Sequence, residues 1–184
     1  MKRGGRAATI NIDGWLALPN VRFSRTDPGR NIYERGLRLD EMFDSLILPL
    51  QAERSISIEA DFAPTESNAM HYRRHRYEYR DVDVIVLEGI FLFKRPYRDH
   101  HDLRVWIDCS FETALERALA RHQEGLPPEA IVREYETIYF AAERLHFELD
   151  RPRESAEVIV INDPRLESPP AERRAGRPPR RRRR

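Results

Sequence analysis

A length of 184 residues allows one domain with a hydrophobic core, and a single cysteine, Cys109, excludes an internal disulfide. Residues 164–184 carry nine arginines and two glutamates, so the net charge of +1 hides an acidic body of −6, which argues against nucleic-acid binding as the main function. The absence of a signal-peptide pattern and of any apolar run near 18 residues predicts a cytoplasmic protein without a membrane partner.

The first third of the chain predicts one strand and one helix. Residues 7–12 form a short β-prone run that ends at Asp13. Residues 15–30 are rich in proline, glycine and asparagine and predict a loop. Apolar side chains at helical spacing then predict an amphipathic helix that begins near Asn31 and ends at Pro49.

The most apolar stretch of the chain lies near its middle. Before it, residues 55–62 alternate apolar and polar side chains and, with the polar stretch that follows them, predict a small antiparallel flap. Residues 82–93, VDVIVLEGIFLF, predict a strand buried on both faces, as in a parallel sheet covered by helices. Ligands of such sheets bind outside the carboxyl ends of the strands, so Glu88 is a candidate for chemistry, although capping of the next turn would also explain it.

The second half alternates strands and helices. Residues 103–107 predict another buried strand, and Ser110 is the expected N-cap of a helix over residues 111–122. A long helix follows, with the core face Ile131, Tyr135, Ile138, Tyr139, Ala142, Leu145 and Leu149. A last strand over residues 158–161 completes an α/β pattern with right-handed parallel connections. Residues 164–184 have few apolar side chains and are predicted to be disordered.

Three acids close predicted parallel strands: Asp13, Glu88 and Asp108. They should meet at one edge of the sheet, where carboxylates beside phosphates suit Mg²⁺ and can accept a proton from an attacking hydroxyl. Arg117 and Arg121 lie four residues apart on one helix face and could neutralise charge on a transferring phosphoryl group. A solvated helix face paired with neighbouring glutamates is the alternative for these arginines.

Four segments together resemble the uridine kinase family of P-loop kinases, which is related to phosphoribulokinase: IDGW, ADFAP, DVIVLEGIFLF and RDHHDLRVWIDCSFETALERALAR. The resemblance runs from about Thr9 to about Pro164. It implies a three-layer P-loop NTPase-type parallel sheet with helices on both faces, within a kinase domain over residues 1–163. It also implies transfer of the γ-phosphoryl group of ATP, with Mg²⁺, to the 5′-hydroxyl of a nucleoside such as uridine or cytidine. Related kinases often associate, and homo-oligomers of this chain are left open.

The resemblance assigns catalytic roles. Asp13 matches the acid that takes the proton from the nucleoside hydroxyl, and Glu88 matches the carboxylate that organises Mg²⁺ and its waters. Arg121, with Arg117 as the weaker partner, matches the lid arginines that close on the triphosphate.

Binding roles follow in the same way. Asp61 and Phe62 match a Tyr-Asp-Phe-like element beside the nucleoside, in which Ala60 replaces the tyrosine. His71 is a further nucleoside contact that the resemblance implies, and Asn162 with Asp163 matches a loop near adenine. Trp15 follows Asp13 on a loop over the expected site, so we hold it open as a base-stacking residue.

One element of the family is missing. A phosphate loop needs G-x-x-x-x-G-K-[ST], and neither Lys2 nor Lys94 follows a glycine. In the family a first strand and a helix carry that loop. This first strand lies in the sheet between the two strands that match residues 82–87 and 103–107. The sheet would therefore lack its central strand, so we expect the isolated chain to be inactive and the true N-terminus to lie upstream.

Two other functions stay open. One is a non-catalytic kinase-like remnant that binds a nucleoside or a partner protein. The other is a nucleic-acid binder that acts through its arginine tail, with binding that depends strongly on salt.

Overall fold

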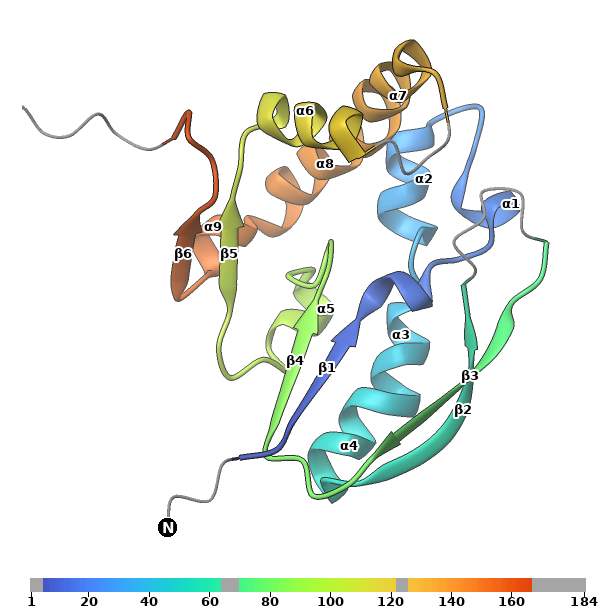
Figure 1. Cartoon of the computed structure of the whole chain (residues 1–184), viewed down its shortest axis with the longest axis vertical. Coiled ribbons are helices and arrows are strands. Elements are labelled where there is room, and N and C mark those ends of the chain that lie inside the picture. Colours follow the sequence, from blue (N-terminus) through green and yellow to red (C-terminus); the bar gives the residue numbers. More distant parts are fainter. Residues whose placement is uncertain (1–4, 64–69, 122–125, 167–184) are drawn as a thin grey trace, which may run out of the picture.

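The computed structural model describes residues 5–63, 70–121 and 126–166. Its strands are β1 (Ala7–Asn11), β2 (Ile56–Phe62), β3 (Arg73–Tyr79), β4 (Val84–Glu88), β5 (Val105–Asp108) and β6 (Val158–Ile161). They form two parallel pairs, β1 with β4 and β5 with β6, and one antiparallel hairpin, β2 with β3 (Figure 1). The predicted mixed α/β fold with parallel strands, helices and a small antiparallel element is confirmed.

Helices connect and cover the strands. The first half contains η1 (Ile12–Trp15), α1 (Pro19–Arg22), α2 (Pro28–Arg35), α3 (Leu39–Met42), the π-turn η2 (Phe43–Ile47) and α4 (Leu48–Glu53). The second half contains α5 (Arg95–Arg98), α6 (Phe111–Arg121), α7 (Pro128–Glu134), the π-turn η3 (Tyr135–Tyr139), α8 (Phe140–Asp150) and α9 (Pro152–Ser155). Among the described residues, no helix is both long enough and apolar enough to cross a membrane.

The main core lies between the β1–β4 pair, the β2–β3 hairpin and the segment from α3 to α4. Ala8 and Ile10 of β1 are 1 % exposed, and Ala60 and Tyr77 contribute the inner face of the hairpin. The helical members of this cluster are Leu39, Met42, Phe43, Leu46, Ile47 and Leu50. Burial of these apolar side chains is the main force that holds the hairpin against β1.

The first helical segment differs from its prediction at both ends and in its middle. Helical structure begins at Pro28, ahead of Asn31, is interrupted at residues 36–38 between α2 and α3, and continues past Pro49. Pro49 lies in the first turn of α4, where a missing N–H costs little, so the helix continues. It ends before Arg54, which adopts a left-handed conformation with φ of 59°.

The long helix near the C-terminus buries a different face from the predicted one. Ile131 and Ala142 are buried as expected, whereas Leu149 is 40 % exposed and the polar side chains of His146 and Asp150 are buried. The π-turn η3 adds a residue to one helical turn and rotates the positions that follow it. A regular 3.6-residue pattern cannot anticipate that shift.

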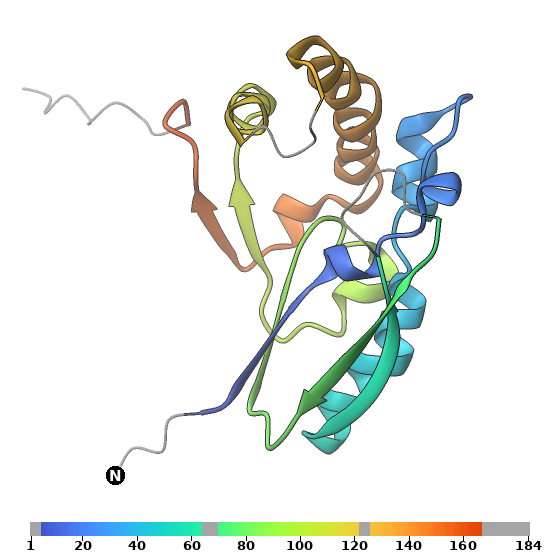
Figure 2. The ribbon, with the colours of Figure 1, turned by 45° about the vertical axis from the view of Figure 1, so that its right-hand side comes forward.

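A second, smaller core joins α2 to α8, which run side by side in Figures 1 and 2. Ile32, Phe91 and Ala142 form its buried centre. Gly29 makes the close packing of the two helices possible, because a Cβ atom there would overlap Ala141.

The two parallel pairs do not join into one sheet. Within the described residues, β4 pairs only with β1 and β5 only with β6. The prediction that residues 82–93 are buried on both faces is wrong for this chain, since Val84 and Val86 are 53 % and 44 % exposed. Val105 and Ile107 of β5 are similarly exposed. Such apolar strands normally have cover on both faces, and part of that cover is not supplied by the described residues.

Described structure extends past residue 163, the predicted end of the domain. Residues 164–166 form a turn, and the guanidinium of Arg165 binds Thr113 and Glu116 of α6. The rest of the predicted disordered tail, residues 167–184, lies outside the described residues.

Candidate active site

Asp13 and Glu88 lie at the same end of the β1–β4 pair. The strand register places Asn11 beside Glu88. Asp13 follows in η1, and its N–H donates to Asn11 Oδ1 at 2.6 Å. Both acidic residues are exposed, and Glu88 has no hydrogen-bond or ion-pair partner among residues 5–63, 70–121 and 126–166. This edge therefore presents two accessible carboxylates.

The third predicted acid does not join them. Asp108 ends β5, in the other parallel pair. Its carboxylate accepts hydrogen bonds from Arg153 Nε at 3.0 Å and from Trp106 Nε1 at 3.2 Å. The ion pair with Arg153 compensates the charge of Asp108. Two of the three predicted acids, Asp13 and Glu88, therefore lie together at one edge.

A glycine follows each of the two accessible acids. Gly89 has a φ of 143°, and a Cβ atom there would overlap the side chain of Ile12. A Cβ atom at Gly14 would overlap the ring of Phe62. The absence of a side chain lets both turns pack closely against their neighbours.

The end of β2 lies against the turn that contains Asp13. Ala63 N donates to Gly14 O at 2.8 Å, and the Phe62 ring covers Gly14. His75 of β3, which no sequence motif singled out, lies 4.9 Å from the Phe62 ring, measured between centroids. An exposed imidazole beside this ring extends the apolar surface next to the acids.

Asp61 and His71 occupy the outer side of the same region. Asp61 Oδ1 accepts from Arg74 Nη1 at 2.8 Å, and Asp61 O accepts from Arg38 Nη2 at 2.5 Å. These bonds fix the end of β2 in position. His71 is exposed and lies two residues ahead of β3.

Trp15 is a core residue, and its proposed base-stacking role is wrong. Its side chain is 0 % exposed, stacks on Tyr77 with 5.9 Å between ring centroids, and has the Arg38 guanidinium 5.2 Å from its ring. The helical turn η1 directs this side chain inward immediately after Asp13. A sequence pattern cannot show which side of such a short turn faces solvent.

The two arginines of α6 lie near the carboxyl ends of β5 and β6. Arg117 Nη2 donates to Asn162 Oδ1 at 3.5 Å, and Arg117 and Arg121 line the same cavity. Neither arginine forms an ion pair with a helix glutamate among the described residues. Glu116 instead binds Arg165 at 2.5 Å. Both guanidinium groups are exposed and accessible to an anion.

Asp163 has a structural role. It is 2 % exposed and accepts hydrogen bonds from Ser110 N at 2.7 Å, Thr113 Oγ1 at 2.8 Å and Arg165 N at 2.8 Å. Burial opposes its ionisation, but these hydrogen bonds hold the pKa of Asp163 below its ordinary value. Ser110 is the N-cap of α6, as predicted, because its hydroxyl accepts from Thr113 N at 3.2 Å. The Asp163 side chain thus anchors α6 and is not available to adenine.

Comparisons with known proteins show what the sequence and the fold of this chain are similar to. No family model matches the chain. Over 147 residues it is 25 % identical to uridine-cytidine kinase A of Dictyostelium discoideum, an alignment that covers 74 % of this chain and 29 % of that protein. A structure of a possible uridine kinase from Bacillus stearothermophilus matches with a TM-score of 0.64 and 18 % identity, over 84 % of this chain and 72 % of that one. The first comparison is a sequence similarity to a uridine-cytidine kinase, and the second shows a shared fold. The chain spans less than a third of the length of its curated relative.

The candidate site fits Mg²⁺ and ATP only in part. Among the described residues, no group of three or more His, Cys, Asp or Glu could hold a metal ion. Mg²⁺ needs only one or two protein carboxylates, and Glu88 offers an accessible one. The phosphates of ATP need a cradle of backbone N–H groups, and the described residues contain no glycine-rich loop that would form it.

Arg22 is a partly buried arginine whose charge interacts with that of Asp13, and no motif singled it out. Burial lowers the pKa of its guanidinium, while Tyr139, Tyr72 and Asp13 act in the opposite direction. Its Nε atom is buried and has no acceptor among the described residues.

The cavity beside α6 has a volume of about 410 Å³ and contains one carboxylate, that of Glu143. It extends to Ile90, two residues beyond Glu88. Its aromatic lining consists of Phe91, Trp106, Phe111, Tyr135, Tyr139, Phe140 and Phe147. Burial in this apolar environment raises the pKa of Glu143 to about 7.

Glu143→Gln should therefore make folding less dependent on pH. Because the folded state raises the pKa from 4.5, Glu143 stabilises the fold fully below pH 4.5, and this contribution is lost as the pH rises through 7. At pH 8 the variant should have a free energy of unfolding about 2 kcal/mol higher than the unmodified chain, with little difference at pH 4.5. Urea denaturation at both pH values measures this. Glu148→Gln, an exposed position on the same helix, is the control, and an equal effect from it would contradict the prediction.

Proposed function

We propose that the chain carries the acceptor side of a uridine kinase-like site, in which the γ-phosphoryl group of ATP passes to the 5′-hydroxyl of uridine or cytidine. The observation that supports this most is the common edge of Asp13 and Glu88, with Phe62 packed against the same turn. Asp13 accepts the proton of the attacking hydroxyl. Asp61, Phe62 and His71 hold the nucleoside beside it.

Groups near the ends of β4 and β5 would compensate the negative charge of the ATP phosphates. Glu88 would hold Mg²⁺ through its waters, and the bound ion would neutralise charge on the transferring group. Arg117 and Arg121 line the cavity that reaches Ile90 and supply further positive charge. Asn162 is bound to Arg117 and lies on the side assigned to adenine.

We propose further that a strand, phosphate loop and helix outside residues 1–184 complete this site. The unpaired edges of β4 and β5 and the exposed valines of both strands support this, because buried-type strands leave few backbone groups unpaired. The isolated chain would then lack most of the catalytic power of the complete kinase, since phosphoryl transfer depends on positioning and electrostatics.

The test has two parts. Protein purified from its native cells should have an intact mass about 3–4 kDa above the 21.8 kDa of this chain, the size of the absent strand, loop and helix. The 184-residue chain alone should bind uridine in a calorimetric titration but release no ADP from ATP. ATP-dependent phosphorylation of uridine by this chain alone would contradict the proposal.

A non-catalytic role is the second candidate, favoured by the lack of a phosphate cradle among the described residues. A native mass of 21.8 kDa with retained nucleoside binding would support such a remnant. A nucleic-acid binder would instead lose all binding on deletion of residues 164–184, with strong salt dependence before deletion.

A further inference from the structure

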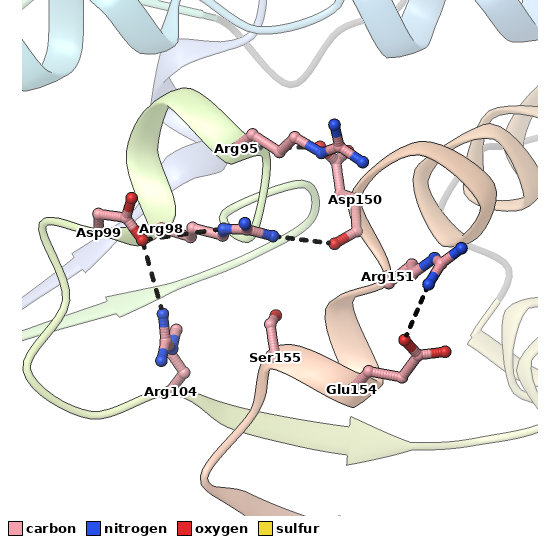
Figure 3. A pocket seen from close by; sticks show the side chains of 8 residues that line it. All are labelled: Arg95, Arg98, Asp99, Arg104, Asp150, Arg151, Glu154 and Ser155. Atoms are coloured by element: carbon pink, nitrogen blue, oxygen red, sulfur yellow. Dashed lines mark hydrogen bonds and ion pairs between the residues drawn. The ribbon is translucent and has the colours of Figure 1, made fainter.

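A second cavity, of about 400 Å³, lies away from the candidate active site, between α5, α9 and the start of β5 (Figure 3). Its lining residues are Arg95, Arg98, Asp99, Arg104, Asp150, Arg151, Glu154 and Ser155. Arg104 directly precedes β5, whereas Asp108 ends the same strand on the side of α6. The two cavities are therefore at opposite ends of β5.

The arginines are partly but not fully compensated by acids. Arg104 donates to both carboxylate oxygens of Glu157, and Arg98 Nη1 donates to Asp150 O at 3.3 Å. Arg151 makes a 3.7 Å ion pair with Glu154 at the surface. The guanidinium of Arg95 has no ion-pair or hydrogen-bond partner within the described part of the chain, and only its backbone N–H binds Asp150.

Asp150, the most buried acid of the lining, has its oxygens occupied. Oδ2 accepts from the Tyr33 hydroxyl at 2.6 Å and lies 2.8 Å from His146 Nδ1, while Oδ1 accepts from Arg95 N at 3.0 Å. The other two acids, Asp99 and Glu154, are 81 % and 72 % exposed and are screened by water. Within the described part of the chain, Arg95 is therefore the lining guanidinium that no acidic side chain pairs with.

We propose that this cavity binds a small phosphate-bearing anion without an aromatic base. Guanidinium groups form charge-assisted, often bidentate hydrogen bonds with phosphate oxygens, and four of them surround the space. No aromatic or aliphatic residue lines it, so a nucleobase would find no surface on which to stack. The volume accommodates inorganic pyrophosphate or a sugar phosphate.

Calorimetric titration of the full chain at 150 mM NaCl tests the proposal, with inorganic pyrophosphate and ribose 5-phosphate as separate probes. Arg95→Gln should weaken binding about fivefold or more, because it removes the uncompensated guanidinium and leaves the backbone hydrogen bond intact. Glu154→Gln should strengthen binding about twofold, because it removes an acid from the rim. The probe that binds more tightly identifies which source of phosphate the site prefers.

Arg80→Gln is the matched control, since Arg80 is an exposed arginine outside the cavity that pairs with Glu78. It removes the same charge and should leave both affinities unchanged within error. Because all variants keep residues 164–184, anion binding to the arginine tail contributes equally to each. The proposal would be overturned if Arg95→Gln and Arg80→Gln bound the probes with equal affinity. It would also be overturned if Arg95→Gln and Glu154→Gln changed the affinity in the same direction.

Discussion

Asp13→Asn should lower the rate of uridine phosphorylation about 100-fold or more in the complete protein that contains these residues and a phosphate loop. The amide keeps the size of the side chain and its exposed place after β1 but cannot accept the proton of the attacking hydroxyl. Steady-state kinetics with ATP and uridine measure the effect. The loss should appear in kcat, with KM for uridine changed by less than about threefold, because Asp61 and Phe62 are untouched.

Asp102→Asn is the matched control, because Asp102 is an exposed aspartate that is not part of the site. Its kcat should equal that of the unmodified protein. A kcat for Asp13→Asn within threefold of normal would remove Asp13 from the role of base. A change confined to KM would assign it to substrate binding.

Asp150→Ala should lower the free energy of unfolding by about 3 kcal/mol, the largest stability effect that we expect from a single polar side chain here. The carboxylate joins Tyr33 of α2, His146 of α8 and the N–H of Arg95 of α5, so its removal leaves several donors unsatisfied in one place. Asp150 is 4 % exposed and His146 is 2 % exposed, so water cannot readily replace the lost hydrogen bonds. Urea denaturation at pH 7.5 measures the loss.

Asp99→Ala, at an exposed acid of the neighbouring cavity, should change the free energy of unfolding by less than about 0.5 kcal/mol. Asp150→Asn should fall between the two, because the amide oxygen can still accept one hydrogen bond. A loss below about 1 kcal/mol for Asp150→Ala would show that the network adds little to the fold.

The same network should make the fold sensitive to acid. Burial lowers the pKa of His146, so the unfolded chain takes up a proton near pH 6.5 that the folded chain resists, and stability falls as the pH drops below this value. Burial alone would raise the pKa of Asp150, but hydrogen bonds from Tyr33 and His146 lower it below its ordinary value of 3.8. The free energy of unfolding should therefore fall further when the pH drops below 3.8. Thermal unfolding of Glu143→Gln, which lacks the opposite contribution of Glu143, should show a midpoint that falls between pH 8 and pH 5, and a midpoint that rises in this interval would contradict the assignment.

Local pattern was sufficient for much of the architecture. The strands near residues 7–12, 55–62, 103–107 and 158–161 appear where alternation or β-branched runs predicted them. The N-cap at Ser110 follows from a hydroxyl ahead of an apolar helix, which is a local property of the sequence. The common edge of Asp13 and Glu88 also follows from the chain alone, because parallel strands bring their carboxyl ends together.

Tertiary structure decided the features that depend on distant segments. Trp15 is buried because Tyr77 and Arg38, far away in the sequence, enclose it. Asp163 is occupied by the start of α6, which lies far from it in the sequence.

The apolar run of β4 shows the difference between what the local sequence determines and what the packing of distant segments decides. Its composition determines that the strand belongs between two covering layers, since apolar side chains gain free energy only when they leave water. Whether that cover exists depends on which other segments pack against it, and within the described residues one edge and part of one face have none. The amino-acid sequence thus defines a strand of the buried type, while the tertiary structure decides how much of its surroundings the described residues provide.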